Sequence, residues 1–243
     1  MKILSIGNSF SQDAHRYLYD IAKQDGVQLK VVNLFIGGCT LRKHYLNMLD
    51  DKAAYAFEFN GKNTGLVVSL RQVLASDAWD VITLQQASHL SWNYESYQPY
   101  LKELAAYVRK YCPHTKIYMH ETWAYENGCE RLNRINGYQT SSEMYADIQK
   151  AYAKAVEEIR ADGLIPSGRA MLRASQTGLE KVHRDSFHAS IGAGRYLLAL
   201  TWYKTLLGKD ITKNNFQEIE EEVTERDRKI IINAVEWATQ FTL

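Results

Sequence analysis

Short apolar runs alternate with longer amphipathic segments along the chain. Five of these runs are aliphatic or rich in β-branched residues, and each is bounded by Gly, Asp, Pro or Asn; they span residues 2–6, 29–35, 81–84, 117–119 and 164–165. Runs of this length and composition are typical of buried β-strands. The sequence therefore predicts five core strands separated by other elements.

The segments between the runs show helical periodicity. Apolar residues recur at helical spacing over residues 97–108 and 145–159. Thr224 with Asp227 resembles a capping box, which predicts a last helix running through Phe241. Strands that alternate with helices favour a parallel sheet covered on both faces. We expect an α/β fold, a three-layer α/β/α sandwich with a five-stranded parallel sheet of flavodoxin-like type.

One segment departs from this alternation. Residues 54–59 alternate in polarity, residues 66–68 are apolar, and Asn60-Gly61 stands between them. An Asn-Gly pair between strand-like runs indicates a β-hairpin, here inserted near residues 54–68. If it covers the site, this hairpin would shape specificity. The sequence contains no linker, so we expect a single domain over residues 1–243.

Composition and charge exclude several classes of protein. Hydrophobic residues make up 46% and charged residues 23%, which excludes a disordered chain. The 29 basic and 28 acidic residues nearly cancel, so no nucleic-acid partner is expected. The three cysteines have no CxxC spacing, which predicts neither a metal site nor a disulfide framework. The pattern does not indicate an oligomeric state.

The hydrophobic runs also bear on location. None approaches the length of a membrane span, so no integral membrane segment is expected. The first apolar run is too short for the core of a signal peptide. As the sequence stands we expect a cytoplasmic protein, with export left open if a leader has been trimmed.

The loop after the first predicted strand is the first candidate for chemistry. Ligands of doubly wound sheets bind at the carboxyl ends of the strands. Gly7 permits a sharp turn there, and Ser9 follows at the start of a helix, where N–H groups and the helix dipole stabilise an oxyanion. Ser9 is therefore a candidate nucleophile. The alternative is that Ser9 or Ser11 only caps the helix.

A second motif supports the interpretation of Ser9 as a nucleophile. Asp185 and His188 stand three residues apart, at what we expect to be a helix start. A hydroxyl nucleophile needs a base, and the base needs an orienting acceptor, which these two residues can supply. The alternative is an N-cap beside a polar first-turn residue. Together with Ser9 after the first strand, the pair favours a Ser-His-Asp arrangement.

These motifs resemble those of the SGNH, or GDSL-type, serine hydrolase superfamily. The closer similarity is to a branch with GNSFS, GGC, LQQ and DxxH motifs, and it extends from residue 3 to about residue 207. The resemblance implies a serine esterase that needs no cofactor, with Ser9 as nucleophile, His188 as general base and Asp185 as its orienting carboxylate. It also implies that the N–H groups of Ser9 and Gly38 are oxyanion donors, although Gly37 fits the motif too.

The third family motif is absent. Most members carry GxND after the third core strand, and its Asn is a further oxyanion donor; here residues 85–89 read Gln-Gln-Ala-Ser-His. A glutamine amide or a neutral imidazole could replace that donor, and we order the candidates Gln85, Gln86, then His89. The alternative is that the glutamines bind backbone groups of a neighbouring loop.

Aromatic residues follow the third and fourth predicted strands. Trp92 lies after one, and His120, Trp123 and Tyr125 lie after the other. Aromatic faces beside polar groups suit sugar rings, so these four are candidate substrate-binding residues. The alternative is ordinary packing, since the chain holds 16 tyrosines and 5 tryptophans.

The sequence thus predicts a serine esterase that hydrolyses a small acyl ester, with acetyl on a carbohydrate as the expected substrate. The expected partner is a small-molecule or carbohydrate ester. One alternative keeps the triad but acts on a lysophospholipid or thioester. Another is a non-catalytic carbohydrate-binding protein on a degenerate hydrolase fold. A phosphate or nucleotide binder using residues 7–11 would leave Asp185 and His188 without a role.

Overall fold

The computed structural model describes residues 1–240 and has a seven-stranded sheet at its centre. The strand order is β4-β3-β2-β1-β5-β6-β7. The strands are β1 (Lys2–Gly7), β2 (Lys30–Phe35), β3 (Tyr55–Phe59), β4 (Lys62–Val68), β5 (Val81–Leu84), β6 (Lys116–His120) and β7 (Gly163–Ile165). β2, β1, β5, β6 and β7 pair in parallel and match the five predicted strands to within one residue at each end.

The predicted hairpin is present, but it joins the sheet, which therefore has seven strands rather than five. β3 pairs antiparallel with β2, and β4 forms the outer edge. The Asn60 N–H donates to the Val31 carbonyl, near the beginning of β2. A Cβ on Gly61 would lie 2.8 Å from the Arg16 carbonyl oxygen, so the turn packs tightly against the end of the first helix. The turn thus lies at the amino end of the parallel strands and does not cover their carboxyl ends.

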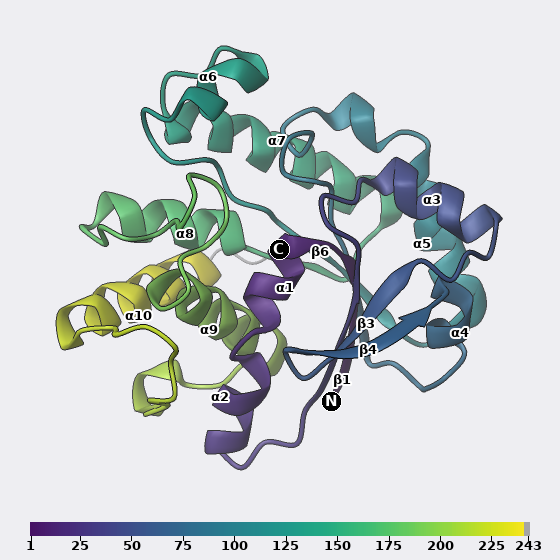
Figure 1. Ribbon diagram of the computed structural model, residues 1–243, viewed down its shortest axis with the longest axis horizontal. Helices are drawn as coiled ribbons and strands as arrows, with labels where there is room; N and C mark the ends of the chain where they lie inside the picture. Colours follow the sequence, from purple (N-terminus) through teal and green to yellow (C-terminus); the bar gives the residue numbers. More distant parts are fainter. Residues whose placement is uncertain (241–243) are drawn as a thin grey trace.

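Helices cover both faces of the sheet and complete the predicted three-layer sandwich (Figure 1). One layer consists of α1 (Ser9–His15), α2 (Leu18–Gln24), α8 (Ser167–Gln176), α9 (Ala193–Leu207) and α10 (Glu225–Thr239). The other consists of α3 (Leu41–Leu49), α4 (Leu70–Leu74), α5 (Tyr100–Tyr111) and α7 (Ser141–Ile159), with the short α6 (Glu130–Asn136) before α7. None of the helices in residues 1–240 has both the length and the apolar character that crossing a bilayer requires.

Two predicted helix boundaries can be compared with the structure. The predicted capping box at the last helix is confirmed in part, since the Thr224 hydroxyl accepts the Asp227 N–H at the start of α10. The expected end of that helix, Phe241, lies outside the described residues. Residues 97–108 begin in a short 3₁₀ turn and continue in α5, because the Gln98–Pro99 unit separates the two.

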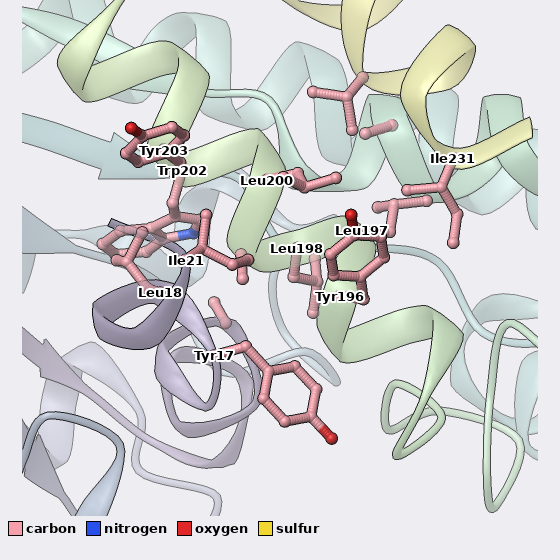
Figure 2. Close-up of a cluster of buried hydrophobic side chains, with 14 of the residues drawn as sticks. Tyr17, Leu18, Ile21, Tyr196, Leu197, Leu198, Leu200, Trp202, Tyr203 and Ile231 are labelled. Atoms are coloured by element: carbon pink, nitrogen blue, oxygen red, sulfur yellow. The ribbon is translucent and has the colours of Figure 1, made fainter. Parts of the chain in front are cut away.

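Strand alternation divides the core between the two faces. Ile3, Val31 and Val81 belong to the cluster under α1, α2 and α9, whereas Leu4, Val32 and Ile82 belong to the opposite cluster. Figure 2 shows the first cluster, where Leu18 and Ile21 of α2 lie close to Trp202 of α9. Complete burial of such a side chain contributes roughly 1.5–3 kcal/mol. This packing fixes α1, which carries Ser9, beside β1 and α9.

Candidate active site

Three side chains from distant parts of the chain meet at the carboxyl end of β1. The Ser9 Oγ lies 2.9 Å from His188 Nε2. His188 Nδ1 lies 2.7 Å from Asp185 Oδ2. The structure therefore brings Ser9, His188 and Asp185 together in one hydrogen-bonded chain. A hydroxyl, an imidazole and a carboxylate in this order are the geometry of an activated nucleophile.

Ser9 is free to face His188 because another residue caps α1. Asn8 is the N-cap, and its Oδ1 accepts the Phe10 N–H at 3.0 Å. The Ser11 hydroxyl accepts the Asn8 N–H at 3.1 Å and completes a capping box. The interpretation of Ser9 as the cap is therefore wrong, while Ser11 does take part in capping. A Cβ on Gly7 would lie 2.0 Å from Ser11 Oγ, so the close packing of this loop requires glycine.

Asp185 and His188 lie in a closed loop before α9, not at a helix start as predicted. His183 and Ala189 form an isolated β-bridge, and the Arg184 N–H donates to the His188 carbonyl at 3.0 Å. Within the loop, Asp185 Oδ1 accepts the His188 N–H at 2.8 Å. The local pairing of carboxylate and imidazole is present, although the backbone that holds it is a loop.

An ion pair fastens this loop to the helix of the nucleophile. Arg184 Nη1 lies 2.9 Å from both carboxylate oxygens of Asp13, which is on α1 and fully buried. Arg195 Nε of α9 donates to the same carboxylate at 2.8 Å. Moving Arg184 or Arg195 away would leave the buried charge of Asp13 less compensated, which costs free energy. Asp13 thereby fixes the loop of His188 relative to Ser9.

The carboxyl group of Asp185 is ionised at neutral pH. Partial burial raises its pKa, but the hydrogen bond from the His188 ring and those from the His188 and Phe187 backbone N–H groups outweigh that effect. The net pKa of Asp185 is below its ordinary value. The anion favours the His188 tautomer that carries its proton on Nδ1 and turns the Nε2 lone pair toward Ser9.

A pocket with a volume of about 390 Å³ opens beside Ser9 and His188. Gly38, with a φ of +61°, and Ala87, Ser88 and His89 of the loop after β5 line it. Its remaining lining residues are Asn8, Phe10, Gly37, Tyr125, Arg131 and Phe187. Among the described residues, the N–H groups of Ser9 and Gly38 have no acceptor. Both are thus available to an oxyanion.

Gln85 and Gln86 do not line this pocket. The Gln85 amide nitrogen donates to Asn8 Oδ1 at 2.8 Å, and its oxygen lies 2.8 Å from His120 Nδ1. Gln86 Oε1 accepts the Leu41 N–H at 3.0 Å, and its nitrogen donates to the Ser96 carbonyl at 3.0 Å. The first two candidates for the third oxyanion donor thus serve neighbouring loops. Of the three, His89 alone lines the pocket.

Of the four predicted substrate-binding residues, one lines the pocket and three do not. Tyr125 lines the pocket, and its hydroxyl lies 3.0 Å from Ser88 Oγ. His120 and Trp123 are 0% exposed and do not line this pocket. Trp123 stacks on Phe10 with ring centroids 3.9 Å apart. The half-buried Trp92 lies outside this lining, and its ring donates to the His89 carbonyl.

Two lining residues escaped the sequence analysis. Phe187 lies inside the DxxH motif, and its ring centroid is 3.9 Å from that of His188. Arg131 reaches the pocket from α6, a segment whose pattern carries no catalytic motif. The position of Phe187 between Asp185 and His188 could have indicated that it lies at the site. Nothing in the sequence around Arg131 indicated its position there. No group of three or more His, Cys, Asp or Glu side chains within residues 1–240 is arranged to hold a metal ion.

Comparisons with known proteins place the chain in a family and identify its fold. A crystal structure of a DUF4886 family protein from Bacteroides uniformis is 34% identical, with a TM-score of 0.91, and the match covers 99% of this chain and 95% of that one. A candidate SGNH hydrolase from Slackia heliotrinireducens is 24% identical, with a TM-score of 0.61, and covers 85% and 98%. Axe2, an acetylxylan esterase from Geobacillus stearothermophilus, is 15% identical, with a TM-score of 0.54, and covers 91% and 97%.

The two more distant structures show a shared fold. No curated protein matches the sequence. The family model described as "Domain of unknown function (DUF4886)" matches residues 2–238, nearly the whole chain. The chain therefore belongs to the DUF4886 family and has the fold of the SGNH hydrolases.

Proposed function

We propose that the protein is a serine esterase that hydrolyses a small acyl ester, an acetyl group on a carbohydrate. The observation that carries the proposal is the continuous hydrogen-bonded chain from Ser9 through His188 to Asp185. Ser9 Oγ attacks the ester carbonyl while His188 Nε2 takes its proton, and the same proton then goes to the leaving alcohol. Water activated by His188 hydrolyses the acyl-enzyme and restores the serine.

The oxyanion of each tetrahedral intermediate is stabilised by three donors in this proposal. Two are the N–H groups of Ser9 and Gly38, which have no acceptor among the described residues. The third is the imidazole of His89 in the loop after β5. Partial burial lowers the pKa of His89, so at neutral pH the ring is uncharged and keeps one N–H to donate. Preorganised donors of this kind supply a large share of the rate enhancement in acyl transfer.

The size and lining of the pocket support a small acyl group on a sugar. A volume of about 390 Å³ is near the low end of ligand pockets. The rings of Tyr125 and Phe187 add apolar surface to the lining, and Ser88 and His89 add polar groups. The shared fold with an acetylxylan esterase is consistent with this substrate class. A lysophospholipid or a long-chain thioester needs a longer apolar groove than these residues line.

The test is hydrolysis of 4-nitrophenyl esters with acyl chains of two to twelve carbons. We expect activity that is highest on acetate and falls as the chain lengthens, because the pocket limits the acyl group. Ser9→Ala should lack this activity while keeping the wild-type melting temperature. Rising activity toward twelve carbons would favour the lysophospholipid or thioester alternative. Undiminished activity in Ser9→Ala would refute the nucleophile assignment.

A further inference from the structure

Among the residues that the structure describes, one arginine lines the candidate active-site pocket. Arg131 lies at the second residue of α6. Its guanidinium carbon is 4.1 Å from the centroid of the Phe187 ring and 6.0 Å from that of Tyr125. A guanidinium stacked on an aromatic face keeps its N–H edge free, and that edge matches the two oxygens of a carboxylate. The two rings thus hold Arg131 ready for an anion at the pocket.

The protein itself does not neutralise this charge. No Asp or Glu lines the pocket, and none of the ion pairs formed within residues 1–240 includes Arg131. The neighbouring charges on the same helix, Glu130 and Arg134, pair with each other. The carboxylate of Asp185 is hydrogen-bonded to His188, and that of Asp13 is paired with Arg184 and Arg195. A guanidinium that forms no ion pair within residues 1–240 therefore gives the pocket a positive potential that favours an anionic ligand.

We infer that Arg131 selects esters whose alcohol half carries a carboxylate, such as an acetylated uronic acid. The inference rests on the proposed function, which assigns the small acyl group to the pocket and leaves the sugar to carry the charge. The bond between the acyl carbon and the sugar oxygen breaks, Ser9 Oγ keeps the acyl group, and His188 gives the proton to the departing sugar oxygen, which becomes a hydroxyl. The carboxylate is unchanged throughout, so Arg131 acts by binding and is a specificity-determining residue.

The test compares two sugars that differ in one group. The substrates are the acetylated methyl glycosides of glucuronic acid and glucose, and the readout is acetate release. We expect the wild type to prefer the uronate by about fivefold in kcat/KM at low salt, the size of an exposed charge pair. Arg131→Gln should remove this preference, because it should lower kcat/KM on the uronate about fivefold more than on the glucoside. Arg134→Gln, on the same helix, is the matched control and should keep it.

Two kinetic results would overturn the inference. One is equal hydrolysis of both sugars by the wild type, and the other is a preference that survives in Arg131→Gln. If neither sugar is hydrolysed, the proposed function fails, and the inference is then decided by binding. Saturation-transfer NMR of unacetylated methyl glucuronoside and methyl glucoside would show Arg131-dependent preference for the uronate if the anion site exists. Equal binding or no binding would refute it.

Discussion

Two polar loops at the same edge of the sheet have opposite roles. After β1, the Ser9 hydroxyl faces His188 and the pocket. After β5, Gln85 and Gln86 are buried, and their amide groups bond to neighbouring loops. The difference arises from what the nearby backbone requires. Asn8 caps α1 and thereby leaves Ser9 free. Among residues 1–240, the Leu41 N–H has only the Gln86 side chain as its acceptor.

The two loops are nevertheless connected. Gln85 donates to Asn8, and Asn8 Nδ2 donates to the Cys39 carbonyl at 3.0 Å. Cys39 directly follows Gly38, so this chain of bonds holds the turn that carries one proposed oxyanion donor. The chain continues from Gln85 to His120, whose Nε2 lies 3.1 Å from Ser167 Oγ. The buried loop thus acts as the support for the reactive one.

Among the changes that test this contrast between the two loops, the largest effect is expected at His188, the general base that faces Ser9. His188→Ala should lower kcat by about 10⁴-fold or more, because it removes the acceptor for the Ser9 proton. Asp185→Asn should cause a loss of kcat that is roughly 10- to 100-fold smaller than that of His188→Ala, since the backbone of the loop still holds the ring. Single-turnover kinetics on 4-nitrophenyl acetate would measure both. A greater loss in Asp185→Asn than in His188→Ala would contradict the assigned roles.

His89 tests whether the loop after β5 contributes a reacting group at all. His89→Ala should lower kcat by about 10- to 100-fold, because one oxyanion donor is lost. His89→Asn, which restores an N–H, should recover part of the rate. His114→Ala is the matched control, since His114 is exposed in the loop before β6, at the other edge of the sheet. Wild-type kcat in His89→Ala would leave the oxyanion with its two backbone donors.

Substitutions of the two glutamines should have different effects, because Gln85 supports the candidate active site and Gln86 supports the fold. Gln85→Ala should lower kcat by about tenfold, because Asn8 loses a partner and the Gly38 turn loosens. Gln86→Ala should lower the free energy of unfolding by about 1–3 kcal/mol, because the buried Leu41 N–H is left unpaired, and should hardly change kcat. Urea unfolding and steady-state kinetics would measure the two. A larger kcat loss in Gln86→Ala would reverse this assignment.

Much of this arrangement follows from the sequence, and the exceptions have physical causes. The five parallel strands were predictable because buried strands carry continuous apolar runs. The meeting of Ser9 with His188 was predictable because carboxyl-end loops converge. The directions of Gln85, His120 and Trp123 were not, because an amide, an imidazole or an indole suits a buried network as well as a pocket. Arg131 was not predictable, because α6 reaches the site only through tertiary packing.

The smallest effect is expected at Glu121, a buried carboxyl group that does not line the pocket. Burial raises its pKa to about 7, although the Arg169 N–H and the Tyr145 hydroxyl partly offset this. Between pH ~4.5, near the ordinary Glu pKa, and pH ~7 the folded state keeps a proton that the unfolded state has lost. This group therefore makes stability fall as pH rises through that window.

Glu121→Gln removes the titration. Its melting temperature relative to the wild type should be higher at pH 8 than at pH 5, by about 2–4 °C for each kcal/mol of relieved penalty. Thermal melts followed by circular dichroism at the two pH values would measure it. The matched control is Glu157→Gln, an exposed change on α7, which should give no such difference. An equal shift at both pH values would show that the folded-state pKa of Glu121 is not raised.

The central claim is that Ser9 is a nucleophile activated by His188, and covalent labelling tests it most directly. We would treat the folded protein with a fluorophosphonate and locate the adduct by mass spectrometry within the peptide that contains Ser9. The account predicts one adduct on Ser9, none in Ser9→Ala and labelling at least about 100-fold slower in His188→Ala. Unlabelled wild-type protein, or equal labelling of Ser9→Ala, would contradict it.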